Sequence, residues 1–248
     1  MSLRKIKPAG LLVAVALMLG ALVSPLKADG LTFGVKGAGT ILLTEAFETR
    51  SDGAESRKAD HTEEALIPSL FVEYNLGEIG NIGDGWVVGL DYVPIKPELG
   101  DESRTITDCS VDDACPGPVA VGINGVGDTV TQKAKADLKY HTTLYVETPG
   151  FWGGFYGKAG GIMTLLQTEE SLGTGAEYPD ETILGAVAGV GFKRYMGNLL
   201  TKLEASYTAY ETINVNARSS DANNTLGAGK ITADPEALAL SFSIGYAF

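Results

Sequence analysis

Side chains that could carry out acid–base or nucleophilic chemistry are few and widely separated in this sequence. Only two histidines occur, His61 in an acidic stretch and His141 between Lys139 and Thr143. A nucleophile, a base and an orienting acid must converge within hydrogen-bond reach. Ser206 is the one serine whose position makes it a candidate partner of His141, and nothing around it marks it as activated. The sequence therefore predicts a protein that is not an enzyme.

Charged and polar residues recur at every second position, and this pattern indicates the elements that carry them. In the clearest run, 135–147, the odd positions are mostly charged or polar and the even ones mostly apolar. Such alternation predicts β-strands whose two faces meet different environments. About 9 to 11 tilted residues suffice to cross a membrane. Eight runs reach this length: 31–46, 65–76, 85–96, 133–147, 151–166, 182–196, 199–211 and 235–248.

The connections between these runs alternate in length. Short links at 77–84, 148–150 and 197–198 alternate with long ones at 47–64, 97–132, 167–181 and 212–234. This predicts an all-β, eight-stranded, antiparallel up-and-down transmembrane barrel with three short periplasmic turns and four long extracellular loops. An even number of strands closes the sheet, so that no unpaired edge meets lipid.

Two observations favour lipid over the cavity of a soluble, lipocalin-like barrel as the environment of the apolar face. Aromatic residues such as Trp86 and Phe155 fall near strand ends, which is typical of interfacial girdles. The opposite face is rich in small residues, as expected where side chains share a narrow lumen: Gly34, Ala38, Gly89, Gly160, Gly185, Gly189, Gly191 and Ser206.

The N-terminus and the overall charge indicate the compartment. Three basic residues precede an apolar run at 11–23, which is too short for a transmembrane helix and typical of a secretory signal peptide. We expect residues 1–28 to be this signal, used in export through the Sec pathway, and residues 29–248 to form the barrel. The net charge of −12 excludes an ordinary nucleic-acid-binding protein, which needs a basic surface.

The only two cysteines, Cys109 and Cys115, lie close together in a polar, turn-rich stretch. In an exported chain such a pair predicts a disulfide that staples a local loop. The neighbouring residues Asp108, Asp112 and Asp113 lack the spacing of an EF-hand loop. No metal site and no cofactor is predicted.

The C-terminal strand carries Leu240, Phe242, Ile244, Tyr246 and Phe248 on one face. It resembles the closing strand of bacterial outer-membrane barrels, and the last four of these residues then form the signal for the barrel-assembly machinery. The segments 189–195 and 200–207 are similar to the sixth and seventh strands of OmpA-type and opacity-protein barrels. The resemblance implies a small barrel in the outer membrane of a Gram-negative bacterium, escorted by periplasmic chaperones. We expect it to lack the peptidoglycan-binding domain of full OmpA.

The interior of an eight-stranded barrel is narrow enough for side chains to fill. Removing one partner of a buried ion pair costs about 3–5 kcal/mol, so charges inside must pair. The parity of the strands predicts a lumen charge network made of Lys36, Glu73, Asp91, Lys139, Glu147, Lys158, Lys193, Lys202 and Glu204.

Three alternatives for the interior remain open. Exchange among the ion pairs would make a small, gated, low-conductance channel. A pore for apolar solutes, as in OmpW-like barrels, would need a lateral opening and an apolar upper lumen, for which Leu42 and Ile162 are the support. A lipid-modifying enzyme similar to the lipid A deacylase barrel would need a His-x-Ser pattern, but Thr143 stands two residues after His141.

The four long predicted loops contain 20 acidic and 6 basic residues. Such a rim repels anionic lipopolysaccharide unless divalent cations bridge the two, and it favours cationic partners. Binding functions concentrate on long loops held by a rigid scaffold. The predicted function is therefore a structural and surface-interaction role, with outer-membrane lipid, lipopolysaccharide and an extracellular ligand or phage as partners.

Overall fold

The computed structural model describes residues 30–49, 55–78, 85–107, 129–171, 176–216, 218–219 and 230–248. The expected signal peptide and the Cys109 and Cys115 pair lie outside these residues. In the described part, one short 3-10 helix, η1 (Leu76–Glu78), accompanies the strands. No helix among these residues is long and apolar enough to cross a membrane.

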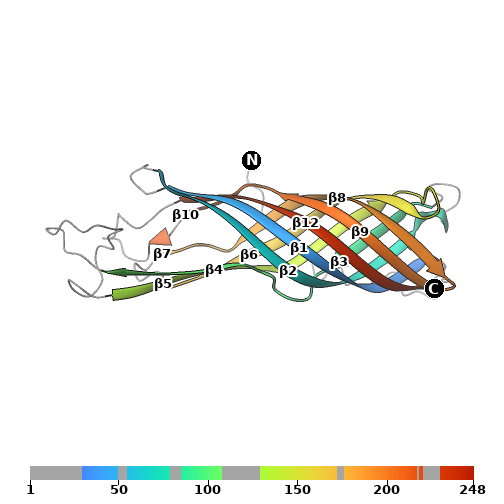
Figure 1. The fold of residues 1–248 in the computed structure, drawn as a ribbon, viewed down its shortest axis with the longest axis horizontal. Coiled ribbons are helices and arrows are strands. Elements are labelled where there is room, and N and C mark those ends of the chain that lie inside the picture. The colour runs from blue at the N-terminus through green and yellow to red at the C-terminus, as the bar shows by residue number, and fades with distance from the viewer. Residues whose placement is uncertain are drawn as a thin grey trace.

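Eight strands form a closed antiparallel barrel in which each strand pairs with the next along the chain and the last pairs with the first (Figure 1). This confirms the predicted fold class. The hydrogen bond from Phe248 N to Leu31 O, 2.9 Å long, lies at the short-turn end of this closure. The eight are β1 (Leu31–Thr49), β2 (Glu55–Asn75), β3 (Val87–Tyr92), β5 (Thr129–Glu147), β6 (Phe155–Ser171), β8 (Glu181–Met196), β9 (Leu199–Tyr210) and β12 (Lys230–Ala247).

Four shorter strands lie toward the opposite, long-loop end. β4 (Glu98–Thr107) pairs with β5 beyond the end of β3, and β10 (Ile213–Asn216) pairs with β12. β7 (Ala176–Glu177) and β11 (Arg218–Ser219) form a small sheet of their own. Parts of three predicted loops are therefore strands.

The barrel strands extend further toward the long-loop end than the alternation predicts. β2 begins at Glu55, so most of the loop predicted at 47–64 is strand. His61 accordingly lies within β2, with its Nε2 2.9 Å from Glu63 Oε1. The alternation fades in this region because both faces carry polar residues, whereas the backbone ladder with β1 continues.

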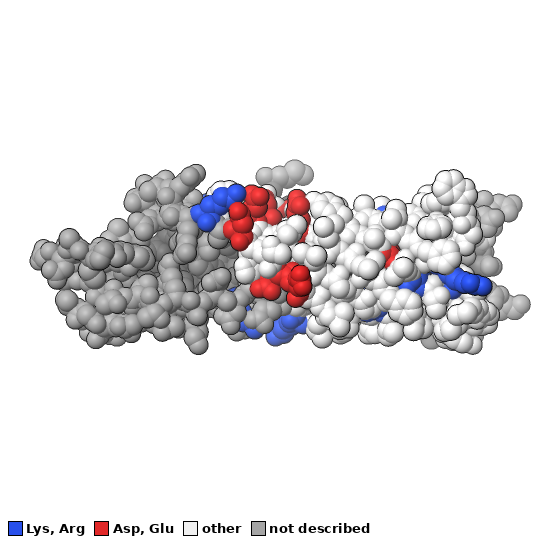
Figure 2. Space-filling model, in the orientation of Figure 1, with Lys and Arg blue, Asp and Glu red and all other residues white. Residues whose placement is uncertain are grey.

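On the face seen in Figure 2, the outer surface of the barrel divides into an apolar belt and an acidic border. The belt ends toward the long loops at Glu45, Glu64 and Glu236. An apolar band of this kind is the lipid-facing surface of a transmembrane barrel. Its exposed side chains include Phe33, Val35, Ile41, Leu66, Leu70, Leu144, Val190, Leu203, Leu238, Leu240, Phe242, Ile244 and Tyr246.

The barrel interior has two layers. Toward the short turns it is lined by buried charged residues, among them Glu73, Glu147 and Lys202. Toward the long loops it holds a cluster of buried apolar residues: Leu138, Leu166, Ile183, Ile213, Val215 and Ala233. We call this second layer the upper apolar cluster.

Candidate functional site: the barrel interior

Ion pairs link the charged residues of the lower layer. Lys202 Nζ donates to Glu73 and to Glu147, and Glu147 also accepts a 3.0 Å hydrogen bond from Lys193 Nζ. Because Glu147 has no exposed surface, its charge depends on these two lysines.

Two further ion pairs complete the layer. Lys158 Nζ donates to Glu204 Oε1 over 2.9 Å, and Lys36 Nζ donates to Asp91 Oδ2. Four lysines thus neutralise four carboxylates, and we call these eight residues the lumen charge network: Lys36, Glu73, Asp91, Glu147, Lys158, Lys193, Lys202 and Glu204.

Two buried tyrosines hold the carboxylates in place. Tyr145 donates from its hydroxyl to Glu73 Oε1 over 2.6 Å, and Tyr156 donates to Glu204 Oε2 over 2.9 Å. Their rings also make cation–π contacts with lysines: Lys158 Nζ lies 4.1 Å from the centre of the Tyr145 ring. Cation–π contacts of this kind strengthen when they are removed from water. Neither tyrosine is among the site residues that the sequence pattern predicts.

Glycines directly across the sheet make room for both rings. Gly89 pairs with Tyr145, and Gly191 pairs with Tyr156. A Cβ added to Gly89 would lie 2.3 Å from Tyr145 Cζ, and one added to Gly191 would lie 2.5 Å from Tyr156 Cζ. An aromatic residue facing a glycine at inward positions of neighbouring strands is thus the signal that could have identified the tyrosines.

Lys139 is the predicted network member that the structure places elsewhere. A β-bulge shifts the β5–β6 register between Lys139 and Thr142, with Tyr140 at a φ of 56°. Before the bulge, buried Leu138 lies opposite buried Leu166, so Lys139 falls on the outer face. A shift of one residue moves every side chain to the other face of a strand. The prediction assumed unbroken alternation and was wrong for this residue.

The candidate catalytic pair is not brought together. His141 Nε2 lies 3.0 Å from the hydroxyl of Tyr210, and none of the described contacts joins it to Ser206. Within the described ranges, no group of three His, Cys, Asp or Glu side chains could hold a metal ion.

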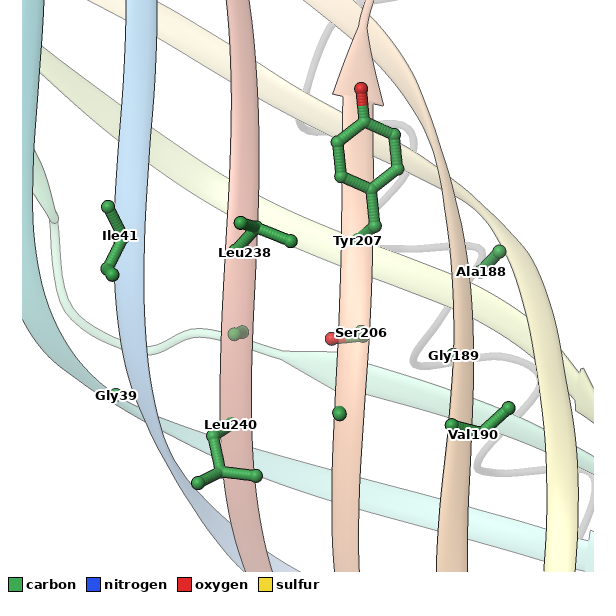
Figure 3. A pocket seen from close by; sticks show the side chains of 11 residues that line it. Gly39, Ile41, Ala188, Gly189, Val190, Ser206, Tyr207, Leu238 and Leu240 are labelled. Carbon is green, nitrogen blue, oxygen red and sulfur yellow. The ribbon is translucent and has the colours of Figure 1, made fainter.

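An apolar groove lies on the outer face of the barrel across β1, β12, β9 and β8 (Figure 3). It is lined by small residues, among them Gly39, Ala188 and Ala205, and by larger side chains such as Ile41, Tyr207 and Leu240. It belongs to the lipid-facing belt and presents no charged group.

No protein-family model and no curated protein sequence matches the chain. Among solved structures, it is similar to the outer membrane protease OmpT of Escherichia coli, at 10% identity and a TM-score of 0.47, over 92% of this chain and 100% of that one. It is also similar to the neisserial surface protein NspA, at 11% identity and a TM-score of 0.37, over 89% of this chain and 100% of that one.

A third similar structure is the attachment invasion locus protein Ail of Yersinia pestis, at 14% identity and a TM-score of 0.33, over 86% of this chain and 99% of that one. These likenesses assign no activity, since their names cover a protease and two surface proteins. The protein is a small closed β-barrel that resembles bacterial outer-membrane proteins.

Proposed function

We propose that this protein is an outer-membrane barrel with a structural and surface-interaction role, closed inside by ion pairs and presenting an acidic surface to cationic partners. The observation that carries the proposal is the mutual neutralisation of the lumen charge network. Each of its carboxylates accepts from a lysine, and both central tyrosines donate into it. A lower lumen filled in this way is a packed polar core, so the cationic partners of this proposal bind on the outer surface.

The outer face of β2, β1 and β12 carries the acidic surface. Asp60, Glu45 and Asp234 lie directly opposite one another across these three strands, and all three are exposed. Lys58 reaches two of them, at 3.5 Å from Glu45 and 3.4 Å from Asp60. Like charges at opposite positions repel, so a cationic partner is favoured here. We call Glu45, Asp60 and Asp234 the acidic row.

Binding of a fluorescent lysine decapeptide to the protein in neutral phosphatidylcholine nanodiscs tests the surface role. Replacing the acidic row in a Glu45→Gln/Asp60→Asn/Asp234→Asn variant is expected to weaken binding about tenfold at low salt. Lys58→Gln removes a positive charge from the same surface, so this variant is expected to bind the peptide more tightly. Equal binding by all three proteins would contradict the proposal.

A gated channel is the second candidate, because Lys202 is shared between Glu73 and Glu147 and could exchange partners. Single-channel recording in planar bilayers separates the two. The proposal expects silence from folded wild type and from folded Glu204→Ala. Discrete openings in wild type that Glu204→Ala alters would favour the channel instead.

A further inference from the structure

The barrel wall parts between β2 and the chain that follows β3. β2 and β3 pair at six positions, ending at Leu70 and Tyr92. Beyond these, β2 continues along β1 to Glu55, whereas the other chain stays with β5: Val93 N donates to His141 O, and β4 pairs with β5. Among the described residues, no strand pairing joins 55–69 to 93–107. We call this break the β2–β4 seam.

The sequence itself ends the β2–β3 ladder. Leu76 N donates to Trp86 O on the β3 side, whereas Asn75 N donates to Gly30 O on the β1 side. Even-numbered residues of β2 therefore direct their backbone groups toward β3. If the register continued, the next such pair would be Pro68 and Pro94, and neither residue has an N–H to donate.

Two of the later even pairs would also disfavour pairing of the two strands. Glu64 would face Glu98, and Asp60 would face Glu102, each placing two like charges directly opposite. The seam is thus encoded by the residue types on both of its sides.

The foot of the seam lies at the depth of the lipid. Leu66 and Pro68 belong to the apolar belt. Leu66 is 78% exposed, and Ile95, on the opposite side of the seam, is 43% exposed. On the inner side lie buried Val93 and Ile162, below the upper apolar cluster. The seam therefore has apolar side chains on both sides: those at lipid depth on its outer face and those of the barrel interior on its inner face.

One polar group at the foot of the seam has no partner. Ser69 is 3% exposed, and its hydroxyl makes no hydrogen bond in the structure. It lies on β2 one residue beyond the last paired position and points inward, level with Lys36 on β1. Buried hydroxyls are nearly always hydrogen-bonded, so this one is available to a bound molecule.

We propose that the β2–β4 seam is a lateral opening through which small apolar molecules bearing one hydrogen-bonding group pass between the lipid and the upper lumen. The apolar body of such a molecule lies among Val93, Ile162 and the upper apolar cluster, and Ser69 binds its polar group. Lys36 of the lumen charge network lies level with Ser69, and the network forms the floor of this site.

Photolabelling in nanodiscs with an aryl diazirine that carries one hydroxymethyl group tests this proposal. Peptide mass spectrometry is expected to find label on inward Val93 and Ile162 as well as on outward Leu144 and Val190. A Leu66→Cys/Lys96→Cys variant, in a Cys109→Ser/Cys115→Ser background, is then joined across the seam with a short bis-maleimide linker. Joining is expected to abolish inward labelling and leave outward labelling unchanged.

Three further variants serve as controls and independent tests. Val72→Cys/Leu90→Cys lies within the paired ladder, so joining it is expected to leave both sets of labels unchanged. Ser69→Ala is expected to lower inward labelling about fivefold, as for the loss of one hydrogen bond. Pro68→Thr/Pro94→Val restores the two missing backbone N–H donors, so that β2 can pair with the chain after β3. This variant therefore closes the seam without a linker. Absence of inward label in the folded wild type, or inward label that survives closure of the seam, would overturn the proposal.

Discussion

Charge neutralisation inside the barrel is decided by single side chains. Lys158 and Glu204 are both buried, and Tyr156 donates to the same carboxylate. Lys158→Met leaves Glu204 as a buried charge without its lysine, and we expect the free energy of unfolding to fall by about 3–5 kcal/mol. The double variant Lys158→Met/Glu204→Gln removes both charges and keeps an acceptor for Tyr156, so it is expected to lose less. Urea unfolding in lipid vesicles, followed by tryptophan fluorescence, measures both. A double variant as unstable as the sum of its single changes would contradict the pairing.

The glycines of the inner and outer faces provide a matched comparison. Gly89→Ala drives a Cβ into the ring of Tyr145 and is expected to cost about 1–3 kcal/mol of unfolding free energy. Gly161→Ala, on the outer face, adds a Cβ that meets nothing within 4 Å, and we expect it to be neutral. The same unfolding measurement distinguishes them. Equal stability of the two variants would show that Tyr145 does not need the space.

At the residue scale, parity predicts which side chains face inward wherever alternation is unbroken, as at Glu73 and Lys202. It fails at Lys139, because a bulge is a local backbone event that leaves no mark in the polar and apolar pattern. The tyrosines were missed for a different reason. In the polar and apolar pattern, an inward-facing aromatic residue looks like an ordinary apolar residue. It can be recognised only from the glycine opposite it on the next strand, and finding that glycine requires the pairing register.

Backbone hydrogen exchange tests the seam at the scale of strands. The amide of Leu66 points toward the seam, whereas that of the adjacent Ile67 points toward β1. We expect the Leu66 amide to exchange about 100-fold faster than those of Ile67 and Leu70, since local opening controls protection. NMR exchange in detergent micelles measures all three. Equal protection of Leu66 and Ile67 would mean that the seam is closed by a partner.

The eight strands were predictable as elements because lipid on one side and a filled lumen on the other impose strict alternation. Their ends toward the long loops were not, since water bathes both faces there and the pattern disappears. Pro68 and Pro94 illustrate the limit of the sequence pattern. Both residues lie within predicted strands, but only the β2–β3 register shows that they would face each other.

For the whole molecule, the position of the belt fixes its depth in the membrane. Leu203 lies in the middle of the belt on β9, and Ala209 lies opposite Glu236 at its acidic border. Leu203→Arg is expected to cost about 2–4 kcal/mol, and Ala209→Arg about 0–1 kcal/mol, because the penalty depends on depth. Reversible unfolding from lipid vesicles measures both free energies. If Ala209→Arg lowers the free energy of unfolding as much as Leu203→Arg does, the apolar belt must extend beyond Ala209.

β1 has 19 residues and pairs with β2 almost to its tip, although about 9 to 11 residues would cross the bilayer. At about 3.3 Å per residue and a tilt near 40°, the surplus raises this hairpin roughly 20 Å above the hydrocarbon. A large molecule arriving from outside would then meet a stiff collar of paired strands that stands above the membrane. Epitopes on that collar keep a fixed height and spacing, because the β1–β2 ladder sets both.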